Sequence, residues 1–278
     1  MKIQELRFAR FAAVALLGLC SLAASSAAAT HPLSYPYGMA VDAKGNLYVA
    51  NSTSNQILVY SPTHTQVTSK TITTNISVPS GVAFDTSGNL WVANQSGNNI
   101  TEYGPTGTPI TSGTISTGIN NPQAIAFDGL GDLWVNNRYS ELAMYAASQN
   151  SPLVTTSTTL VTAIATHQMN MVLGTDSLSD LIEISTWLVN PNGANVSFIA
   201  LTCYAAGYDV AGNLYCGNQD HTLTVMTPAG TVSTVAQLGF FPTGLALDTK
   251  RGYIYVANGG ANTIAVYNTS GTLLHTIQ

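Results

Sequence analysis

Charge is what this sequence has least of. Only 8% of its 278 residues are charged, with 8 Lys and Arg against 13 Asp and Glu, whereas globular domains usually carry about 25%. So few cations cannot build a surface that neutralises phosphates, which excludes nucleic acid as a partner. Intrinsic disorder is excluded as well, because 45% of the residues are hydrophobic and disordered chains are poor in such residues.

The sequence also lacks a hydrophobic run long enough to span a membrane. The apolar stretch at 11–24 falls short of the ~20 residues that a spanning helix needs. It follows three basic residues and precedes small residues that end at Ala29, which is the order of a secretory signal peptide. We therefore predict a leader over 1–29 and one secreted or periplasmic, monomeric domain over 30–278. That domain has five basic and twelve acidic residues, a net charge of −7, so it is not expected to bind anionic membranes.

One phrase recurs along the predicted mature chain. It begins with Pro-x-Gly, has an Asp four residues after that Gly, and ends with Asn-Leu-aromatic-Val-Ala-Asn. The copies read PYGMAVDAKGNLYVAN at 36–51, PSGVAFDTSGNLWVAN at 79–94, PQAIAFDGLGDLWVNN at 122–137, CYAAGYDVAGNLYCGN at 203–218 and PTGLALDTKRGYIYVAN at 242–258. A degenerate copy lies at 162–175. With this copy included, the repeat is about 41 residues long and the predicted mature chain holds six units.

Each unit shows the two-residue hydrophobic period of β-strands. Short segments rich in Val, Ile, Tyr and Trp alternate with Gly, Asn, Asp and Ser, which is typical of strands separated by tight turns. A fourth, weaker stretch closes each unit, as TSKTITTN does at 68–75. The sequence therefore predicts an all-β fold, a six-bladed β-propeller of four-stranded antiparallel blades.

The repeated phrase resembles the NHL repeat, in which P-x-G-φ-A-φ-D is followed by G-x-φ-Y-V-A-D. The second Asp of that pattern is Asn in the well-kept copies here. SMP-30/gluconolactonase-like proteins and streptogramin B lyases share this repeat style. The resemblance therefore implies a propeller but specifies the architecture much better than an activity.

Residues that recur in every copy are expected to be structural. The repeated Asp should accept backbone N–H bonds of a tight turn, and the Gly three residues later should adopt a positive φ. The closing Asn should cap the next hairpin, and the aromatic residue should pack between blades. These sets are Asp42, Asp85, Asp128, Asp209 and Asp248; Gly45, Gly88 and Gly212; Asn51, Asn94, Asn137, Asn218 and Asn258; and Tyr48, Trp91, Trp134, Tyr215 and Tyr255.

Two cysteines, Cys203 and Cys216, remain in the predicted mature chain. An unbroken hairpin register would place them about three residues from opposition, roughly 10 Å along the strand, whereas a disulfide needs Cα atoms closer than about 7 Å. This register favours buried free thiols, with a disulfide as the alternative in an oxidising compartment. The spacing matches no metal motif.

A binding site is predicted where the copies differ, at the end of the ring where the first strands begin. The residues that follow the opening Pro, and the loops between the second and third strands, meet there. The predicted binding residues are Tyr37, Ser80, Gln123, Arg138, Tyr139, Asp176, Tyr204, Asp220, His221 and Thr243.

This set favours a non-catalytic binding or scaffold module for an exported protein, a peptide or a glycan, with no cofactor and no metal. Hydroxyl, amide and aromatic groups suit such partners. The alternative is a metal-dependent lactonase or lyase of the SMP-30 or streptogramin lyase type, which would need a divalent cation. Hard cations are bound by several carboxylate oxygens, which the residues after the opening Pro do not supply. His221 is the one histidine expected at this end, so a site with two histidines is not expected either. No catalytic residues are assigned.

Overall fold

The computed structural model describes residues 32–138, 141–146, 152, 154–157, 161–167, 171–177, 184–189, 195–199 and 203–278, with backbone alone for residues 154–199. The predicted leader lies outside the described residues. The chain from His31 to Gln278 forms one compact unit. Within the described part, no helix is both long and apolar enough to cross a bilayer.

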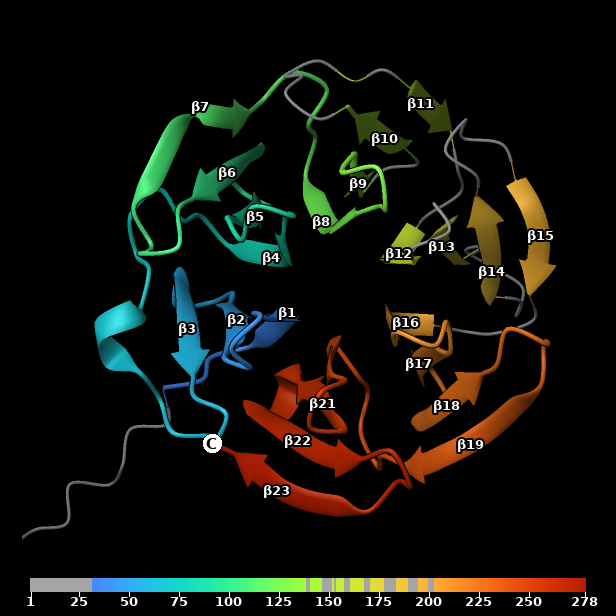
Figure 1. The fold of residues 1–278 in the computed structure, drawn as a ribbon. Coiled ribbons are helices and arrows are strands. Elements are labelled where there is room, and N and C mark those ends of the chain that lie inside the picture. The colour runs from blue at the N-terminus through green and yellow to red at the C-terminus, as the bar shows by residue number, and fades with distance from the viewer. Residues whose placement is uncertain are drawn as a thin grey trace, which may run out of the picture. The chain divides into compact units, whose positions relative to one another are not determined.

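The described strands form antiparallel sheets that stand radially around an axis, which is a β-propeller (Figure 1). The first sheet has three strands, β1 (Pro36–Val41), β2 (Leu47–Asn51) and β3 (Gln56–Tyr60). Four strands make each of five further blades: β4 (Pro79–Phe84), β5 (Leu90–Asn94), β6 (Asn99–Tyr103) and β7 (Pro109–Ile115); β8 (Pro122–Phe127), β9 (Leu133–Asn137), β10 (Glu141–Tyr145) and β11 (Val154–Ser157); β12 (Val161–His167), β13 (Met171–Ser177), β14 (Ile184–Val189) and β15 (Asn195–Ile199); β16 (Cys203–Tyr208), β17 (Leu214–Asn218), β18 (Thr222–Met226) and β19 (Val232–Gln237); and β20 (Gly244–Asp248), β21 (Tyr253–Asn258), β22 (Thr263–Asn268) and β23 (Leu273–Ile277).

The predicted set of six four-stranded blades is wrong, because five blades of the described chain have four strands and the first sheet does not. Segment 68–75, expected to be its outer strand, begins with the 3-10 helix η1 (Thr68–Lys70). This turn reduces pairing along β3 to two isolated bridges, Ile57 with Ile72 and Tyr60 with Gln66. The all-β propeller fold itself is confirmed.

The innermost strands contact one another around the axis, and β1 contacts both β4 and β20. The last blade is built from the chain's final strands alone, so the first and last blades join without exchanging a strand. A repeated hydrogen bond joins neighbouring blades instead. Asn55 Oδ1 accepts the N–H of Val78 at 2.6 Å, and Asn98 and Asn262 accept those of Asn121 and Tyr35 at 2.7 Å.

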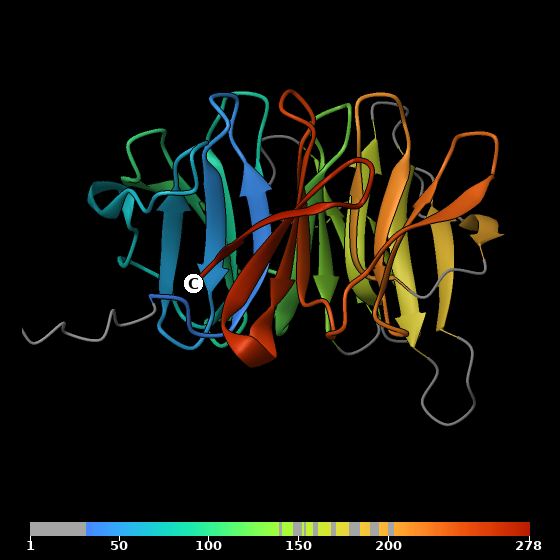
Figure 2. The ribbon, with the colours of Figure 1, turned by 90° about the horizontal axis from the view of Figure 1, so that it is seen from below.

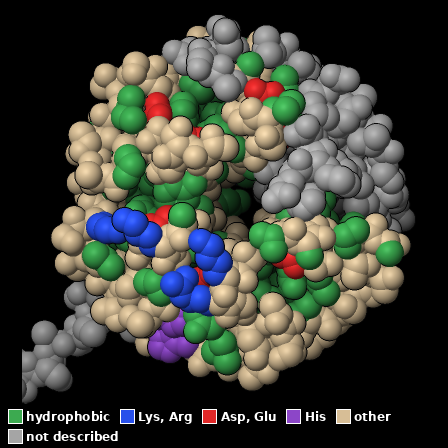
Figure 3. Space-filling view, viewed as in Figure 1, with side chains coloured by type: hydrophobic (Ala, Val, Ile, Leu, Met, Phe, Trp, Pro, Cys, Tyr) green, Lys and Arg blue, Asp and Glu red, His purple; other side chains and the backbone are tan. Residues whose placement is uncertain are grey.

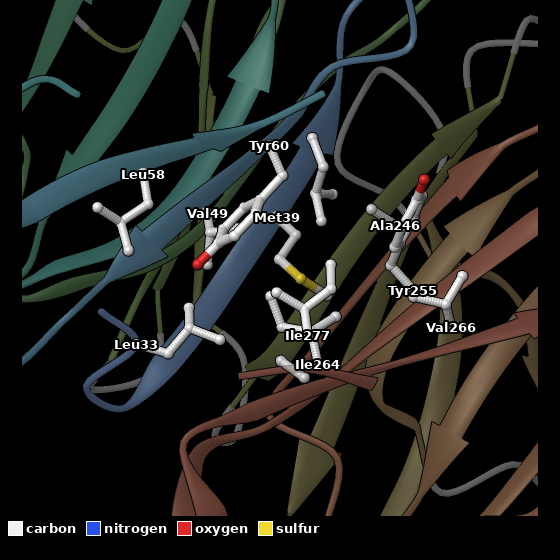
Figure 4. Close-up of a cluster of buried hydrophobic side chains, with 12 residues drawn as sticks. Leu33, Met39, Val49, Leu58, Tyr60, Ala246, Tyr255, Ile264, Val266 and Ile277 are labelled. Atoms are coloured by element: carbon white, nitrogen blue, oxygen red, sulfur yellow. The ribbon is translucent and has the colours of Figure 1, made fainter. Parts of the chain in front are cut away.

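An apolar core fills the seam between the first and last blades (Figure 4). Met39 and Val49 from the first blade pack in one cluster with Tyr255, Ile264 and Val266 from the last blade. All five side chains are buried, so the hydrophobic effect stabilises this closure.

The repeated Asp and aromatic residues have the predicted structural roles. In the first four well-kept copies, one Asp oxygen accepts the backbone N–H groups two and four residues further on, as Asp85 does from Ser87 and Asn89 at 2.9 and 2.8 Å. The glycines of these turns, Gly45, Gly88 and Gly212, have φ of 87°, 81° and 84°. Tyr48 and Trp91 meet Phe84 and Phe127 of the following blades edge-on.

The repeated Asn residues differ from the prediction. Asn258 caps the turn that follows it, as expected, by accepting the N–H of Ala261. In three other copies the Asn oxygen instead accepts the N–H of the residue 17 positions earlier, as Asn51 does from Ser34 at 2.6 Å. These Asn side chains therefore hold the loop that precedes their own blade.

Cys203 and Cys216 form a disulfide with their Cα atoms 5.0 Å apart, so the expectation of free thiols is wrong. The reason is a bulge between Cys203 and Ala205, which brings Cys203 opposite Asn218. Cys216 is then two residues from opposition, not three. Residues two apart share a face of the sheet, and both sulfurs therefore point to the same side.

Candidate functional site

The strands run between two different ends of the propeller (Figure 2). At one end, here called the loop end, the loops between second and third strands lie beside the starts of the first strands. Backbone bonds from Ser52 to Tyr35, from Gln95 to Val78 and from Arg138 to Asn121 hold them together there. The opposite end, here called the turn end, carries the turns built on the repeated Asp.

A narrow cavity of about 80 Å³ lies on the axis between the innermost strands. Predicted binding residues from five blades line it: Tyr37, Ser80, Gln123, Tyr204 and Thr243. The cavity is narrow because the first strands approach closely at glycines. A Cβ on Gly38 or Gly244 would collide with the backbone of the neighbouring inner strand.

The hydroxyl groups of Ser80 and Thr243 are already used to join blades. Ser80 Oγ donates to the carbonyl of Pro122 at 2.7 Å, and Thr243 Oγ1 donates to the carbonyl of Pro36 at 2.8 Å. Each acceptor is the opening Pro of the next blade around the ring, so these two predicted binding residues have a structural role. Gln123, in contrast, forms no side-chain hydrogen bond with another described residue.

Aromatic rings gather at the mouth of the cavity. The ring of Tyr37 stacks on that of Tyr35 with centroids 6.3 Å apart, and Tyr204 meets Phe241 edge-on at 4.4 Å. Phe241 and Tyr35 are 39% and 43% exposed, so their rings are open to a partner. Burial raises the pKa of Tyr37, and the negative charge of ionised Tyr35 raises it further. The positive charge of Arg138 opposes that rise.

The sequence reasoning missed Tyr35 and Phe241. A signal was present, because each directly precedes the opening Pro of its copy. Aromatic residues occupy that position in the first and last copies, whereas Val78 and Asn121 occupy it in the second and third.

Five predicted residues are absent from the described lining of the cavity. One of them, Arg138, lies at the loop end, where its N–H donates to the carbonyl of Asn121. Asp220 is exposed and caps its own turn, accepting the N–H of Thr222 at 3.1 Å and its hydroxyl at 2.6 Å. His221 is exposed beside it with φ of 64°. Asp176 pairs with Val161 in the backbone of β13, but its side chain is not described, and Tyr139 lies outside the described residues.

The donor set on the axis does not fit a hard divalent cation. Its described lining residues offer hydroxyl and amide groups but no carboxylate or imidazole, whereas such cations take several carboxylate oxygens. Throughout the described residues, no three His, Cys, Asp or Glu side chains gather as ligands would.

Comparison with known proteins yields similar structures but no similar sequences: no family model and no curated protein matches the chain. Hydrazine synthase from Kuenenia stuttgartiensis is 14% identical over 88% of this chain and 80% of its own, with a TM-score of 0.64. Virginiamycin B lyase from Staphylococcus aureus is 12% identical over 87% and 83%, with a TM-score of 0.62. A gluconolactonase from Xanthomonas campestris is 11% identical over 82% and 84%, with a TM-score of 0.68. At these identities the likeness concerns the fold, and the chain therefore shares the β-propeller fold of lyase and lactonase propellers.

Proposed function

We propose that this protein is an exported, monomeric binding module that recognises a glycan or peptide segment across the mouth of its axial cavity. Tyr37, Tyr204 and Phe241 present aromatic surfaces to the partner, Gln123 offers an amide, and Arg138 supplies positive charge for an acidic group. Aromatic rings and Arg are the residues that contribute most to recognition surfaces.

The size of the axial cavity carries this proposal. Pockets that enclose small-molecule ligands measure about 300–1,000 Å³, whereas this cavity holds about 80 Å³. A substrate could not be enclosed there, but an extended partner could lie over the mouth and insert one small group. The polar lining and the exposed rings of Tyr35 and Phe241 suit that mode of binding.

The test is a screen of the mature protein on glycan and peptide arrays, followed by calorimetry with the best ligand. Loss of one central aromatic side chain typically costs more than about 1 kcal/mol of binding free energy, so Tyr204→Ala should weaken binding at least about fivefold. Arg138→Gln should weaken acidic ligands selectively. Lys70→Gln, at the turn end, is the matched control and should leave the affinity unchanged. Binding that survives both loop-end substitutions would refute this site.

A metal-dependent lactonase or lyase is the second candidate, favoured by the likeness of the fold to those enzymes. It predicts turnover of a lactone such as gluconolactone, or of virginiamycin B, that requires an added divalent cation. A cation that binds the native state at 100 times its Kd would stabilise the protein by about 2.7 kcal/mol. Such stabilisation, together with turnover abolished by Asp176→Ala, would replace the binding proposal with this one.

A further inference from the structure

Basic side chains are few in this protein, yet they gather at the turn end. The described chain has five Lys and Arg residues, and four of them, Lys44, Lys70, Lys250 and Arg251, belong to the first and last blades. Figure 3 shows the blue side chains together over that part of the face. Arg138 is at the loop end. In a mature chain with a net charge of −7, this distribution is a marked local exception.

A cleft of about 680 Å³ lies beside this group, between the first and second blades. Its wall includes the edge-on pair of Tyr48 and Phe84, whose ring centroids are 5.0 Å apart, together with Ile72. Lys44 and Lys70 also line it. The cleft has the volume of a small-molecule site and combines an apolar wall with two ammonium groups.

Departures from the repeat provide both lysines. Lys70 ends η1, the 3-10 helix that takes the place of a regular outer strand in the first sheet. Lys44 occupies a turn position that is Ser87 and Leu130 in the next two blades. The corresponding cleft between the second and third blades measures about 470 Å³ and is lined by Ser87, Leu130 and Glu102, with no Lys or Arg. The cationic character therefore belongs to one cleft and not to the repeat.

The turn that carries Lys44 is fixed by its neighbours. Lys250 Nζ donates to the carbonyl of Ala43 at 3.1 Å, and Arg251 donates to the carbonyl of Lys44 at 3.2 Å while it pairs with Asp248 at 2.8 Å. These bonds hold the backbone and leave the Lys44 ammonium group exposed. A fixed backbone lowers the entropy lost when a ligand binds.

Two carboxylates also line the cleft, and both are bound within their own turns. One oxygen of Asp42 accepts the N–H groups of Lys44 and Asn46. Asp85 accepts the indole N–H of Trp91 at 3.1 Å in addition to its own turn bonds. Among described residues, neither Lys44 nor Lys70 forms an ion pair. The two ammonium groups are thus the charged groups that remain available to a ligand.

We propose that this cleft is a second ligand site, independent of the axial one, and that it binds a small amphipathic anion. The ligand class is a carboxylate or sulfonate attached to an aromatic or branched apolar body. The body packs against Tyr48, Phe84 and Ile72, and the anionic group meets Lys44 and Lys70.

The experiment uses two fluorescent probes of nearly equal shape, the anionic 8-anilinonaphthalene-1-sulfonate and the neutral N-phenyl-1-naphthylamine. Each is titrated into the mature wild-type protein and into Lys44→Gln, Lys70→Gln and the double variant. Ser87→Gln is the matched control, because Ser87 holds the turn position that corresponds to Lys44 and lines the cleft between the second and third blades. Both lysines are on the surface, so thermal unfolding should show that all variants fold.

The sulfonate is expected to saturate one site. Each lysine substitution should raise its Kd about threefold to fivefold, as expected for loss of one exposed ion pair, and added salt should weaken binding in the wild type. Ser87→Gln should change the Kd less than twofold, and the neutral probe should respond to none of the variants. Absence of saturable binding, a sulfonate Kd unchanged in the double variant, or an equal effect of Ser87→Gln would each overturn the proposal. Because Tyr204→Ala leaves this cleft intact, failure here and failure of the axial site are distinguishable.

Discussion

The hydroxyl that joins the second and third blades offers a direct test of how this ring is stabilised. Ser80 is 3% exposed, and its hydroxyl donates to the carbonyl of Pro122 at 2.7 Å and approaches that of Ala93 at 3.3 Å. Ser80→Ala removes the donor and leaves the Pro122 carbonyl without it. A buried polar group that loses its partner costs ~1–3 kcal/mol, so the free energy of unfolding should fall by about 1–2 kcal/mol.

Urea denaturation followed by tryptophan fluorescence would measure this change as a lower midpoint at constant slope. The melting temperature should fall with it, by roughly 2–4 °C for each kcal/mol in a domain of this size. Thr243→Val, which removes the equivalent hydroxyl at the seam, should cost a similar amount. Ser87→Ala, in an exposed turn, is the control and should stay within about 0.5 kcal/mol of the wild type. A loss at Ser80 no larger than at Ser87 would refute the reasoning.

Three further predictions concern covalent and titrating groups. Cys216→Ser, or reduction, opens a link across 13 residues and should lower the free energy of unfolding by about 3 kcal/mol, the value for a loop of ~15 residues. Thiol titration of the unfolded chain, expressed from residue 30, should find no free thiol before reduction. Burial, followed by the charge of His275, lowers the pKa of His64 from 6.5. As the pH falls, His64 is therefore protonated in the unfolded chain before it is protonated in the folded one. The urea midpoint should fall as the pH drops below about 6.5. His64→Asn, which suits the positive φ of 64° there, should reduce that pH dependence. Burial, followed by the charge of Asp85, raises the pKa of Glu102, so the contribution of Glu102 to stability is lost as the pH rises through that pKa. Glu102→Gln should therefore raise the melting temperature more at pH 7 than at pH 4. An equal rise at both pH values would contradict the assignment.

Local, repeated chemistry was predictable from the sequence. The bonds of an Asp turn span four residues and recur in copy after copy, so alignment of the copies isolates them. Asp85 and Asp128 accept the N–H groups that this reading requires. The aromatic position was predictable for the same reason, since one residue type at one place in each blade must meet the adjacent blade.

Features that depend on a single residue were not predictable in this way. The bulge beside Cys203 changes the register by one residue and thereby changes which side chains share a face. The turn at η1 replaces a regular strand although TSKTITTN resembles the other outer segments. Ser80 and Thr243 are suited by composition to a polar binding surface, and only the distances to Pro122 and Pro36 show that they join blades.

The seam between the first and last blades explains where the two candidate sites lie. Inner blades have a neighbour in sequence on both sides, whereas the two ends of the chain meet only through side chains and loops. At the loop end, Asn262 accepts the N–H of Tyr35, whose ring stacks on Tyr37. At the turn end, Lys250 and Arg251 hold the turn that carries Lys44. The residues that close the ring therefore also position one part of each candidate site. The first and last copies, which close the ring, depart from the repeat at these positions.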